Sequence, residues 1–357
     1  MALSDTEPVL AAVVITRNEE RWIAICLASV LEAVASFRGA EVVVVDSCSE
    51  DDTVARALSF PVRVLELRRS APRSAALGRL VGQHATRSRY VLFVDGDTEI
   101  RGEWVRSAVE HLEAHPQVAG VAGKLHELYF EGERLVGENP DCFGAGPRPE
   151  DVFQLGGNAI YRRAALEAVG SFNPYVVSYE EDELAERLRR LTGSTVRRLP
   201  IVLGTHRTGR PGTLAELRRR RRENLIKGYG QTLRLGLRNG TFATHARRMA
   251  RYLQFLACCA AGCVALLVSI VTGDGRFIGV WLLGVVLFVA AFMLKSRSVR
   301  KPLALILDWA FWAGPLVRGF CERPQDPRAL ALGDLVAAAH ETSDATAGRR
   351  EMRAGRC

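Results

Sequence analysis

The chain has 357 residues, of which 25% are charged and 48% hydrophobic, with a formal net charge of +8. This globular composition excludes collagen-like, coiled-coil and wholly disordered chains, and a mean hydropathy near zero excludes a polytopic transporter. The eight cysteines are scattered without a Cys-x-x-Cys pair, which excludes a disulfide framework or zinc site and indicates a reduced, cytoplasm-facing protein.

The first half of the chain alternates short apolar runs with amphipathic segments. Residues 1–8 lack the basic start and apolar core of a signal peptide, and we expect a short tail there. Strands are predicted at 9–16, 41–46, 62–66 and 90–95, with helices at 19–37, 51–59 and 73–87. Strands separated by helices indicate βαβ units and a mostly parallel, Rossmann-like sheet. Ligands bind such sheets at the carboxyl ends of the strands.

The middle of the chain is less regular and then becomes basic. Residues 131–150 are rich in Gly and Pro and are predicted to be a loop, and 179–191 is predicted to be a charged helix. Arginine clusters at 218–222 and 247–251 come just before the longest apolar stretch, and no helix-turn-helix, RRM or zinc-finger pattern is visible. This placement favours an anionic membrane over nucleic acid, and 216–252 are expected to form basic interfacial helices.

Two uncharged runs follow, at 253–272 and 277–294, separated by a turn at 273–276. Each is long enough to cross about 30 Å of hydrocarbon. Basic residues flank the pair, at Arg251 and at 295–301, which favours a transmembrane hairpin over a hairpin buried in a soluble core. The same flanks predict that both outer ends, and the sheet domain, are cytoplasmic. The expected location is therefore the inner (cytoplasmic) membrane, with more than one crossing.

A third apolar run, at 302–320, contains Asp308, Pro315 and Arg318. A charge at the centre of a membrane span costs about 2.5–3.5 kcal/mol on insertion scales. Residues 295–337 are therefore expected to contain an interfacial or re-entrant helix. The polar remainder, 338–357, is predicted to be a disordered tail.

Asp95-Gly96-Asp97 is the sharpest local signal. Two carboxylates directly after a buried strand suit Mn²⁺ or Mg²⁺, which would neutralise a departing diphosphate. A polar turn that ends the strand is the simpler interpretation. A phosphatase of the haloacid-dehalogenase type is a further alternative, although such enzymes place Thr or Val where this chain has Glu99, and place the motif on the first strand.

The other strand ends decide between these interpretations. Six segments occur in a fixed order: 13–20, 43–53, 79–85, 91–97, 156–162 and 180–193. Each is weak alone, but the series resembles the inverting family 2 glycosyltransferases of GT-A fold over about residues 9–206. The resemblance implies a GT-A domain at 9–215 in a membrane-anchored, bacterial-type member.

The resemblance also implies roles for single residues. Those at the donor nucleotide and sugar are Thr16, Glu19, Asp46, Arg79, Asp95, Gly157 and Asn158. Within that set Asp46 would hydrogen-bond the base, commonly uracil, although an N-cap role is an alternative. Arg79 could instead lie on a solvated helix face. Asp97, with Asp95, would hold the metal. His206 matches a histidine that some relatives place against metal or diphosphate, and a structural role is its alternative.

The catalytic base is harder to assign. The family carries an acidic pair that opens a helix, and aligning Leu184 and Arg187 on that pattern makes Glu181 the base. A shift by one residue gives Glu181-Asp182 and makes Asp182 the base, so both remain candidates. Neighbouring carboxylates raise one another's pKa, which suits proton abstraction. A charged helix N-terminus would also explain acids at this position.

These implications combine into one expected activity. The enzyme would transfer a sugar with inversion from a nucleotide-diphosphate sugar, with UDP favoured, to a lipid-linked glycan or polyprenyl phosphate. Processive relatives carry a Gln-x-x-Arg-Trp motif that is missing from residues 217–231, so we expect a single addition. A catalytically silent membrane scaffold of the same fold and the dehalogenase-type phosphatase are the alternatives.

Overall fold

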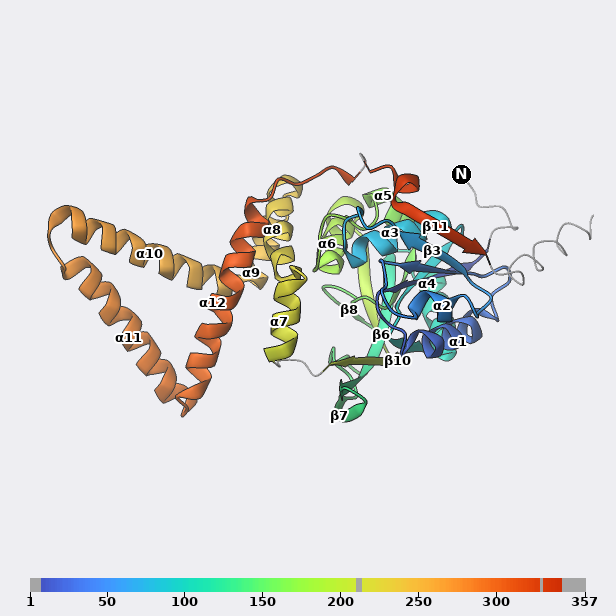
Figure 1. The fold of residues 1–357 in the computed structure, drawn as a ribbon, viewed down its shortest axis with the longest axis horizontal. Helices are drawn as coiled ribbons and strands as arrows, with labels where there is room; N and C mark the ends of the chain where they lie inside the picture. Colours follow the sequence, from blue (N-terminus) through green and yellow to red (C-terminus); the bar gives the residue numbers. More distant parts are fainter. Residues whose placement is uncertain (1–7, 210–213, 328–329, 342–357) are drawn as a thin grey trace, which may run out of the picture. The chain divides into compact units, whose positions relative to one another are not determined.

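The computed structural model describes residues 8–209, 214–327 and 330–341. The chain divides into two compact units, one of residues 1–220 with 325–357 and the other of residues 221–324 (Figure 1). The first contains the sheet and the second contains the long helices.

One mixed sheet of eleven strands organises the first unit. Its main path runs β11-β3-β2-β1-β4-β9-β6-β10-β5, with β7 beside β6 and β8 beside β10. The first four strands pair in parallel, as predicted. The strands are β1 (Leu10–Thr16), β2 (Glu41–Asp46), β3 (Arg63–Leu67), β4 (Tyr90–Asp95), β5 (Thr98–Ile100), β6 (Val118–Glu131), β7 (Arg134–Asn139), β8 (Glu150–Asp151), β9 (Ala159–Arg162), β10 (Thr195–Gly209) and β11 (Val336–Glu341).

Helices fill the connections between the strands. They are α1 (Ile23–Val34), α2 (Thr53–Ala57), α3 (Ala75–Ala85), α4 (Gly102–Ala114), α5 (Arg163–Val169) and α6 (Glu180–Thr192). The Ser74 side chain accepts a hydrogen bond from the Leu77 amide (3.1 Å) and caps α3. α6 has four acidic residues in its first turn and ends at Gly193, which adopts φ +70°. The first predicted helix begins later than expected, at Ile23, after a turn in which the Glu19 carbonyl accepts from the Trp22 and Ile23 amides (both 2.9 Å).

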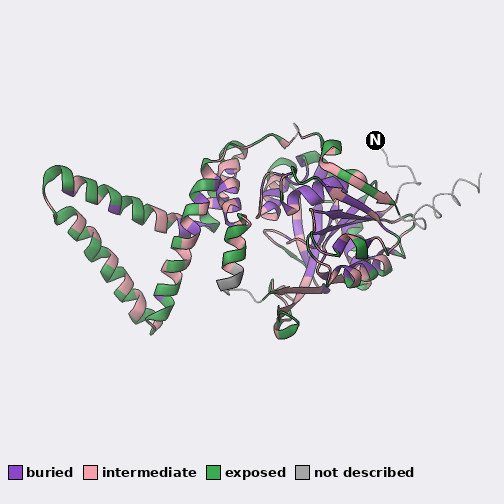
Figure 2. Cartoon of the chain, in the orientation of Figure 1, coloured by how far each residue is buried: buried purple, intermediate pink, exposed green. Residues whose placement is uncertain are grey.

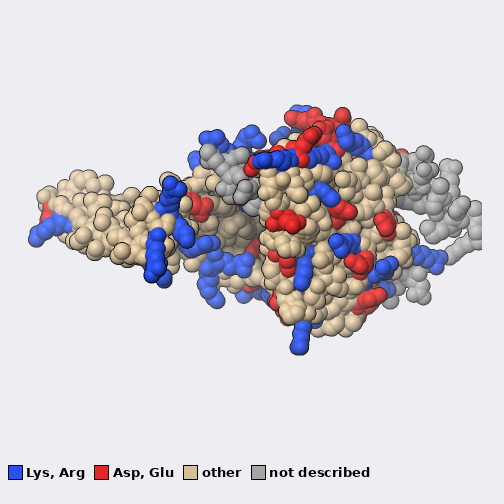
Figure 3. All heavy atoms as spheres, turned by 90° about the horizontal axis from the view of Figure 1, so that it is seen from below, with Lys and Arg blue, Asp and Glu red and all other residues tan. Residues whose placement is uncertain are grey.

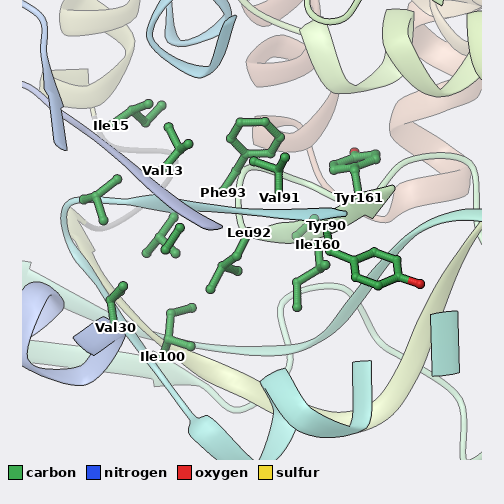
Figure 4. Packing of buried hydrophobic residues seen from close by; sticks show 14 of the residues in the cluster. Val13, Ile15, Val30, Tyr90, Val91, Leu92, Phe93, Ile100, Ile160 and Tyr161 are labelled. Atoms are coloured by element: carbon green, nitrogen blue, oxygen red, sulfur yellow. The ribbon is translucent and has the colours of Figure 1, made fainter. Parts of the chain in front are cut away.

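Apolar side chains cover both faces of the central strands, and the strands are the most buried part of this unit (Figure 2). Figure 4 shows one layer on one side of β1, β4 and β9, made of Val13, Ile15, Val91, Phe93 and Tyr161. The opposite layer contains Tyr90, Leu92, Ile160, Ile100 and Val30. Two-sided burial explains why these strands are continuous apolar runs in the sequence.

Strands occur in two segments where none was predicted. The segment 131–150, predicted to be a loop, contains β7, which forms a hairpin with β6, and ends at β8. Residues 338–341, assigned to a disordered tail, belong to β11, which pairs antiparallel with β3. Both predictions are wrong for the same reason: edge strands gain backbone hydrogen bonds without an apolar pattern. The rest of the predicted tail, 342–357, lies outside the described residues, as does most of the predicted tail 1–8.

The second unit begins within α7 (Leu214–Arg222), which contains the five consecutive arginines. It continues with η1 (Leu225–Lys227), α8 (Gly228–Asn239), α9 (Phe242–Arg248), α10 (Ala250–Thr272), α11 (Arg276–Ser296) and α12 (Arg300–Cys321). The last three are long and apolar enough to cross a membrane. Their surface is largely exposed in Figure 2 and largely uncharged in Figure 3. Exposed apolar helices of this length indicate a membrane-anchored protein.

α12 is one continuous helix, and Pro315 lies inside it. It packs tightly on η1 and α8: a Cβ at Gly230 would overlap the backbone of α12, and a Cβ at Gly319 would overlap the Lys227 carbonyl in η1. Glu322 binds Lys227 (2.7 Å) and Gln231 (2.6 Å) beside this crossing. Its interfacial placement stays a prediction.

Candidate active site

The carboxyl ends of β1, β2 and β4 bring the predicted donor residues to one edge of the sheet. Thr16 pairs in register with Asp46, and Ile15 pairs with Asp95. Thr16 is buried, and its hydroxyl oxygen has no hydrogen-bond partner. This edge is where a parallel sheet of this kind binds ligands.

Asp46 is buried at the end of β2 and accepts hydrogen bonds from the Ser49 amide (2.8 Å) and hydroxyl. Burial raises its pKa, while the bonds from Ser49 oppose that rise. It does not cap α2, because Asp51 accepts the hydrogen bond from the Thr53 amide (3.1 Å) at that helix start. The N-cap alternative is therefore wrong.

Arg79 forms the centre of a second group, which we call the Arg79 cluster: Arg79, Asp95, Asn158, Glu180 and Glu181. The guanidinium is 2% exposed and contacts three carboxylates. The distances are 3.0 Å to Asp95 Oδ1, 2.7 Å to Glu180 Oε1 and 3.3 Å to Glu181 Oε1. A solvated helix face is therefore wrong for Arg79, whose charge holds carboxylates from β4 and α6 together.

Asp95 is held in place from β9 and the segment before it. The Asn158 Oδ1 accepts a hydrogen bond from the Asp95 amide (2.9 Å), and Asn158 Nδ2 donates to Asp95 Oδ2 (3.3 Å). A Cβ at Gly157 would overlap Asp95 Oδ2 and lie 2.6 Å from Arg79 Nη2. Position 157 therefore requires glycine for close approach to the cluster.

The two candidate bases lie in the first turn of α6. Tyr179, just before it, has a left-handed backbone (φ 63°), a strained conformation for an aromatic residue. Burial, followed by the neighbouring Glu180, raises the pKa of Glu181 to about 8, although Arg79 opposes this. Glu181 belongs to the Arg79 cluster, and Asp182 follows it on the same turn, half-buried.

Asp97 and His206 form a third group, with Glu19 and Glu127. His206 Nε2 lies 3.1 Å from Asp97 Oδ2, and its Nδ1 lies 3.4 Å from Glu127 Oε1. Burial lowers the pKa of His206, but Asp97 and Glu127 outweigh it and raise that pKa to about 10. Burial and the charge of Asp97 raise the pKa of Glu19 to about 8. The positive charge of protonated His206 therefore offsets the negative charges of Asp97 and Glu127.

Asp97 also has an oxygen available for a cation. Its Oδ1 is buried without a hydrogen-bond partner, while Oδ2 is bound by His206. In the part of the chain that the structure describes, no three His, Cys, Asp or Glu side chains form a complete metal site. Mg²⁺ commonly binds one or two carboxylates and completes its shell with phosphate oxygens and water. Asp97 and a deprotonated His206 fit such a shared metal.

Glu127 is the member of this group that sequence reasoning missed. It lies on β6 directly across from His206 on β10. The pairing joins residues 79 positions apart, and no local pattern in the sequence marks it.

Residues 11–170 match the sequence profile of a family described as Glycosyl transferase family 2. The curated proteins include no match. Mannosyltransferase PcManGT from Pyrobaculum calidifontis, solved in complex with GDP-Man and Mn²⁺, is 20% identical, with a TM-score of 0.54 over 90% of this chain and 89% of that chain. This likeness shows a shared GT-A fold.

Two other solved structures match less closely in shape. S. aureus TarS 1–349 is 20% identical, with a TM-score of 0.48, covering 88% of this chain and 93% of that one. This chain spans 43% of a longer TarS structure. Glucosyl-3-phosphoglycerate synthase from Mycobacterium tuberculosis is 20% identical, with a TM-score of 0.45, covering 63% of this chain and 80% of that one.

Proposed function

Since residues 11–170 form a domain of glycosyl transferase family 2, and the chain is thus a glycosyltransferase, we propose that it transfers one sugar with inversion from a nucleotide-diphosphate sugar. The observation that carries the proposal is the convergence of Asp97-His206 and Glu181 at the carboxyl edge of one sheet. One group suits a diphosphate and its metal, and the other suits proton removal from an acceptor.

Asp97 and His206 would hold Mn²⁺ or Mg²⁺, with Asp95 nearby. Such a cation supplies charge neutralisation for the diphosphate leaving group. The complex of PcManGT with GDP-Man and Mn²⁺ supports a metal-dependent donor site of this fold. Asp46 and Thr16 would bind the base and ribose, and we propose a UDP-sugar as the donor.

Glu181 would act as the general base. Its carboxylate takes the proton of the acceptor hydroxyl, and that oxygen forms a bond to the anomeric carbon. The bond from this carbon to the diphosphate breaks on the opposite face, and the nucleoside diphosphate leaves with the electron pair. Arg79 keeps Glu181 and Asp95 fixed relative to one another, which aligns base and donor.

The acceptor is proposed to be a lipid-linked glycan or a polyprenyl phosphate at the cytoplasmic face of the inner membrane. The three long apolar helices and the basic α7 support this assignment. Anchoring confines the enzyme to the same surface as a lipid acceptor, which raises the acceptor's effective concentration.

Thermal unfolding of the detergent-solubilised protein tests the proposal. The melt is recorded with UDP, GDP, TDP and CMP, each with and without Mn²⁺. A ligand at 100 times its Kd stabilises by about 2.7 kcal/mol. We expect one nucleoside diphosphate to raise the Tm only with metal, UDP by preference, and Asp97→Ala to abolish the shift. The exposed carboxylate of Glu133 provides the control, Glu133→Ala.

The outcomes separate the alternatives. Folded protein that no nucleotide stabilises would contradict the proposal. If the protein binds nucleotide but turns over no donor, and Glu181→Gln leaves that binding unchanged, the result would indicate the silent scaffold. The phosphatase alternative requires Asp95 as a nucleophile, but Arg79 and Asn158 engage both of its oxygens, and the family match replaces that alternative.

A further inference from the structure

Arg198 on β10 is a buried cation with unused hydrogen-bond donors. It is 3% exposed. Its Nη2 donates to the carbonyl oxygens of Gln154 (3.0 Å) and Leu155 (3.3 Å), while Nε and Nη1 are buried without a partner. Among residues 8–209, 214–327 and 330–341, no carboxylate lies within ion-pair distance of it. Burial lowers the pKa of Arg198, while Cys142 and the charges of Asp141 and Glu150 oppose that lowering.

The comparison with Arg79 shows how unusual this is. Both guanidinium groups are almost completely buried, but Arg79 contacts three carboxylates and Arg198 contacts none. Burying a charge without an ion-pair partner is unfavourable. A contribution to stability therefore does not explain an arginine at position 198. Its unused donors, Nε and Nη1, suit an anionic ligand.

The strand register brings Arg198 to the face that carries the catalytic groups. Val196 pairs with Gly120, and Gly120 pairs with Tyr161. Arg198, two positions beyond Val196, lies on the same face as Tyr161, whose layer is labelled in Figure 4. The Tyr161 hydroxyl is also buried without a hydrogen-bond partner.

The two unused groups are linked to the Arg79 cluster by electrostatics and by the chain. Burial raises the pKa of Tyr161, as does the charge of Glu181, while Arg79 and Arg198 oppose the rise. The chain itself connects the two places: Arg198 binds the Leu155 carbonyl, and Gly157, two residues on, packs against Asp95. Tyr161 therefore interacts electrostatically with the candidate base Glu181, and Arg198 is linked to the Arg79 cluster through the segment 155–157.

Phe143 covers the guanidinium. Its ring centroid lies 3.8 Å from Arg198 Cζ, and its side chain is 37% exposed. Asp141 holds the loop by accepting hydrogen bonds from the amides of Phe143 (3.2 Å) and Ala145 (2.7 Å). Gly156, at φ +85°, allows close approach, because a Cβ there would lie 2.8 Å from the ring. An apolar side chain on a surface loop thus packs over the guanidinium.

We propose that Arg198 and Tyr161 bind a phosphate group of the acceptor after Phe143 moves aside. Arginine offers a planar fork of N–H donors that matches phosphate oxygens, and a tyrosine hydroxyl adds a further donor. The proposal rests on the proposed function and narrows it, because the acceptor then carries phosphate beside its reacting oxygen. The diphosphate of the donor is the other possible source of phosphate.

Binding of farnesyl phosphate and farnesol to the full-length, detergent-solubilised protein tests the subsite. The two probes differ only in the phosphate. We expect binding of farnesyl phosphate but not farnesol, and a roughly 30-fold or greater loss of affinity in Arg198→Gln. Arg197→Gln is the matched control, since Arg197 is the next residue, faces the other side of the sheet and pairs with Asp151 (2.8 Å).

Nucleotide binding identifies the source of the phosphate. The nucleoside diphosphate with Mn²⁺ should bind Arg198→Gln as it binds the wild type. Equal weakening of nucleotide and farnesyl phosphate would assign Arg198 to the donor and overturn the proposal. Farnesyl phosphate that fails to bind, or binds Arg198→Gln unchanged, would also overturn it. If folded wild-type protein binds no nucleotide, that result would instead overturn the proposed function.

Two further variants cover the case in which Arg198→Gln does not fold. Arg198→Lys keeps the charge without the fork and should bind farnesyl phosphate with intermediate affinity. Phe143→Ala removes the cover and should speed association of farnesyl phosphate several-fold while nucleotide binding stays constant. An unchanged association rate in Phe143→Ala, together with wild-type affinity in Arg198→Lys, would contradict the subsite.

Discussion

The buried arginines at this site differ in how many carboxylates they contact, and Arg79 contacts three. Arg79→Met would leave Asp95, Glu180 and Glu181 without their shared cation. We expect a loss of about 3–5 kcal/mol in the free energy of unfolding, measured by urea denaturation. Arg89→Met, which breaks the exposed pair with Glu113 (3.0 Å), should cost about 0–1 kcal/mol. Similar losses in both variants would contradict the central role of Arg79.

The raised pKa of Glu181 predicts a pH dependence of the rate. A base must be ionised to accept a proton, so kcat should rise with pH as Glu181 deprotonates around pH 8. Glu181→Gln should abolish turnover, while Asp182→Asn should keep both the activity and the pH profile. The reverse pattern would make Asp182 the base.

The same shift has a consequence for stability. The pKa of Glu181 is higher in the folded protein than its ordinary 4.5, so the folded state binds this proton more tightly. That stabilisation is complete below about pH 4.5 and is lost as pH rises through 8. Glu181→Gln should therefore gain stability relative to wild type between pH 5 and about pH 9, measured by thermal melts at each pH. A constant difference would contradict the shift.

Among the elements, the segment that enters β9 is the most constrained. Gly157→Ala would push Asp95 and Arg79 apart, because the new Cβ overlaps both side chains. We expect a loss of turnover of about 100-fold, since small displacements of reacting groups have effects of that size. Gly209→Ala is the control, as no atom lies within 4 Å of a Cβ there. Turnover near the wild-type level in Gly157→Ala would show that the cluster tolerates displacement.

The elements also show what the sequence could predict. β1, β2 and β4 were predictable because burial on both faces makes each a nearly continuous apolar run. β7 and β11 were missed because they are edge strands with exposed or alternately exposed positions. The strand ends predicted Asp46, Asp95 and Asp97. Glu127 and Arg198 depend on the register between β6 and β10, which no local pattern encodes.

For the whole molecule, β11 joins residues 336–341 to the sheet of the first unit. The Arg68 amide donates to the Leu335 carbonyl (2.7 Å), and His340 binds Glu66 (2.8 Å). A chain that ends at residue 331 should melt at a lower temperature than one that ends at 341, because the edge of β3 then loses its partner. Equal melting temperatures would show that β11 contributes nothing to the stability of the sheet.

The return of β11 to the sheet also restricts how many times the chain can cross the membrane between β10 and β11. The chain leaves the sheet after β10 and rejoins the same sheet at β11, so both points lie on one side of the bilayer. A path that starts and ends on one side crosses an even number of times, and α10, α11 and α12 cannot all cross. α12, which contains Asp308 and Arg318, is the helix least suited to crossing. A membrane-impermeant thiol reagent should then reach Cys321 from the side of the sheet domain and Asp274→Cys from the opposite side.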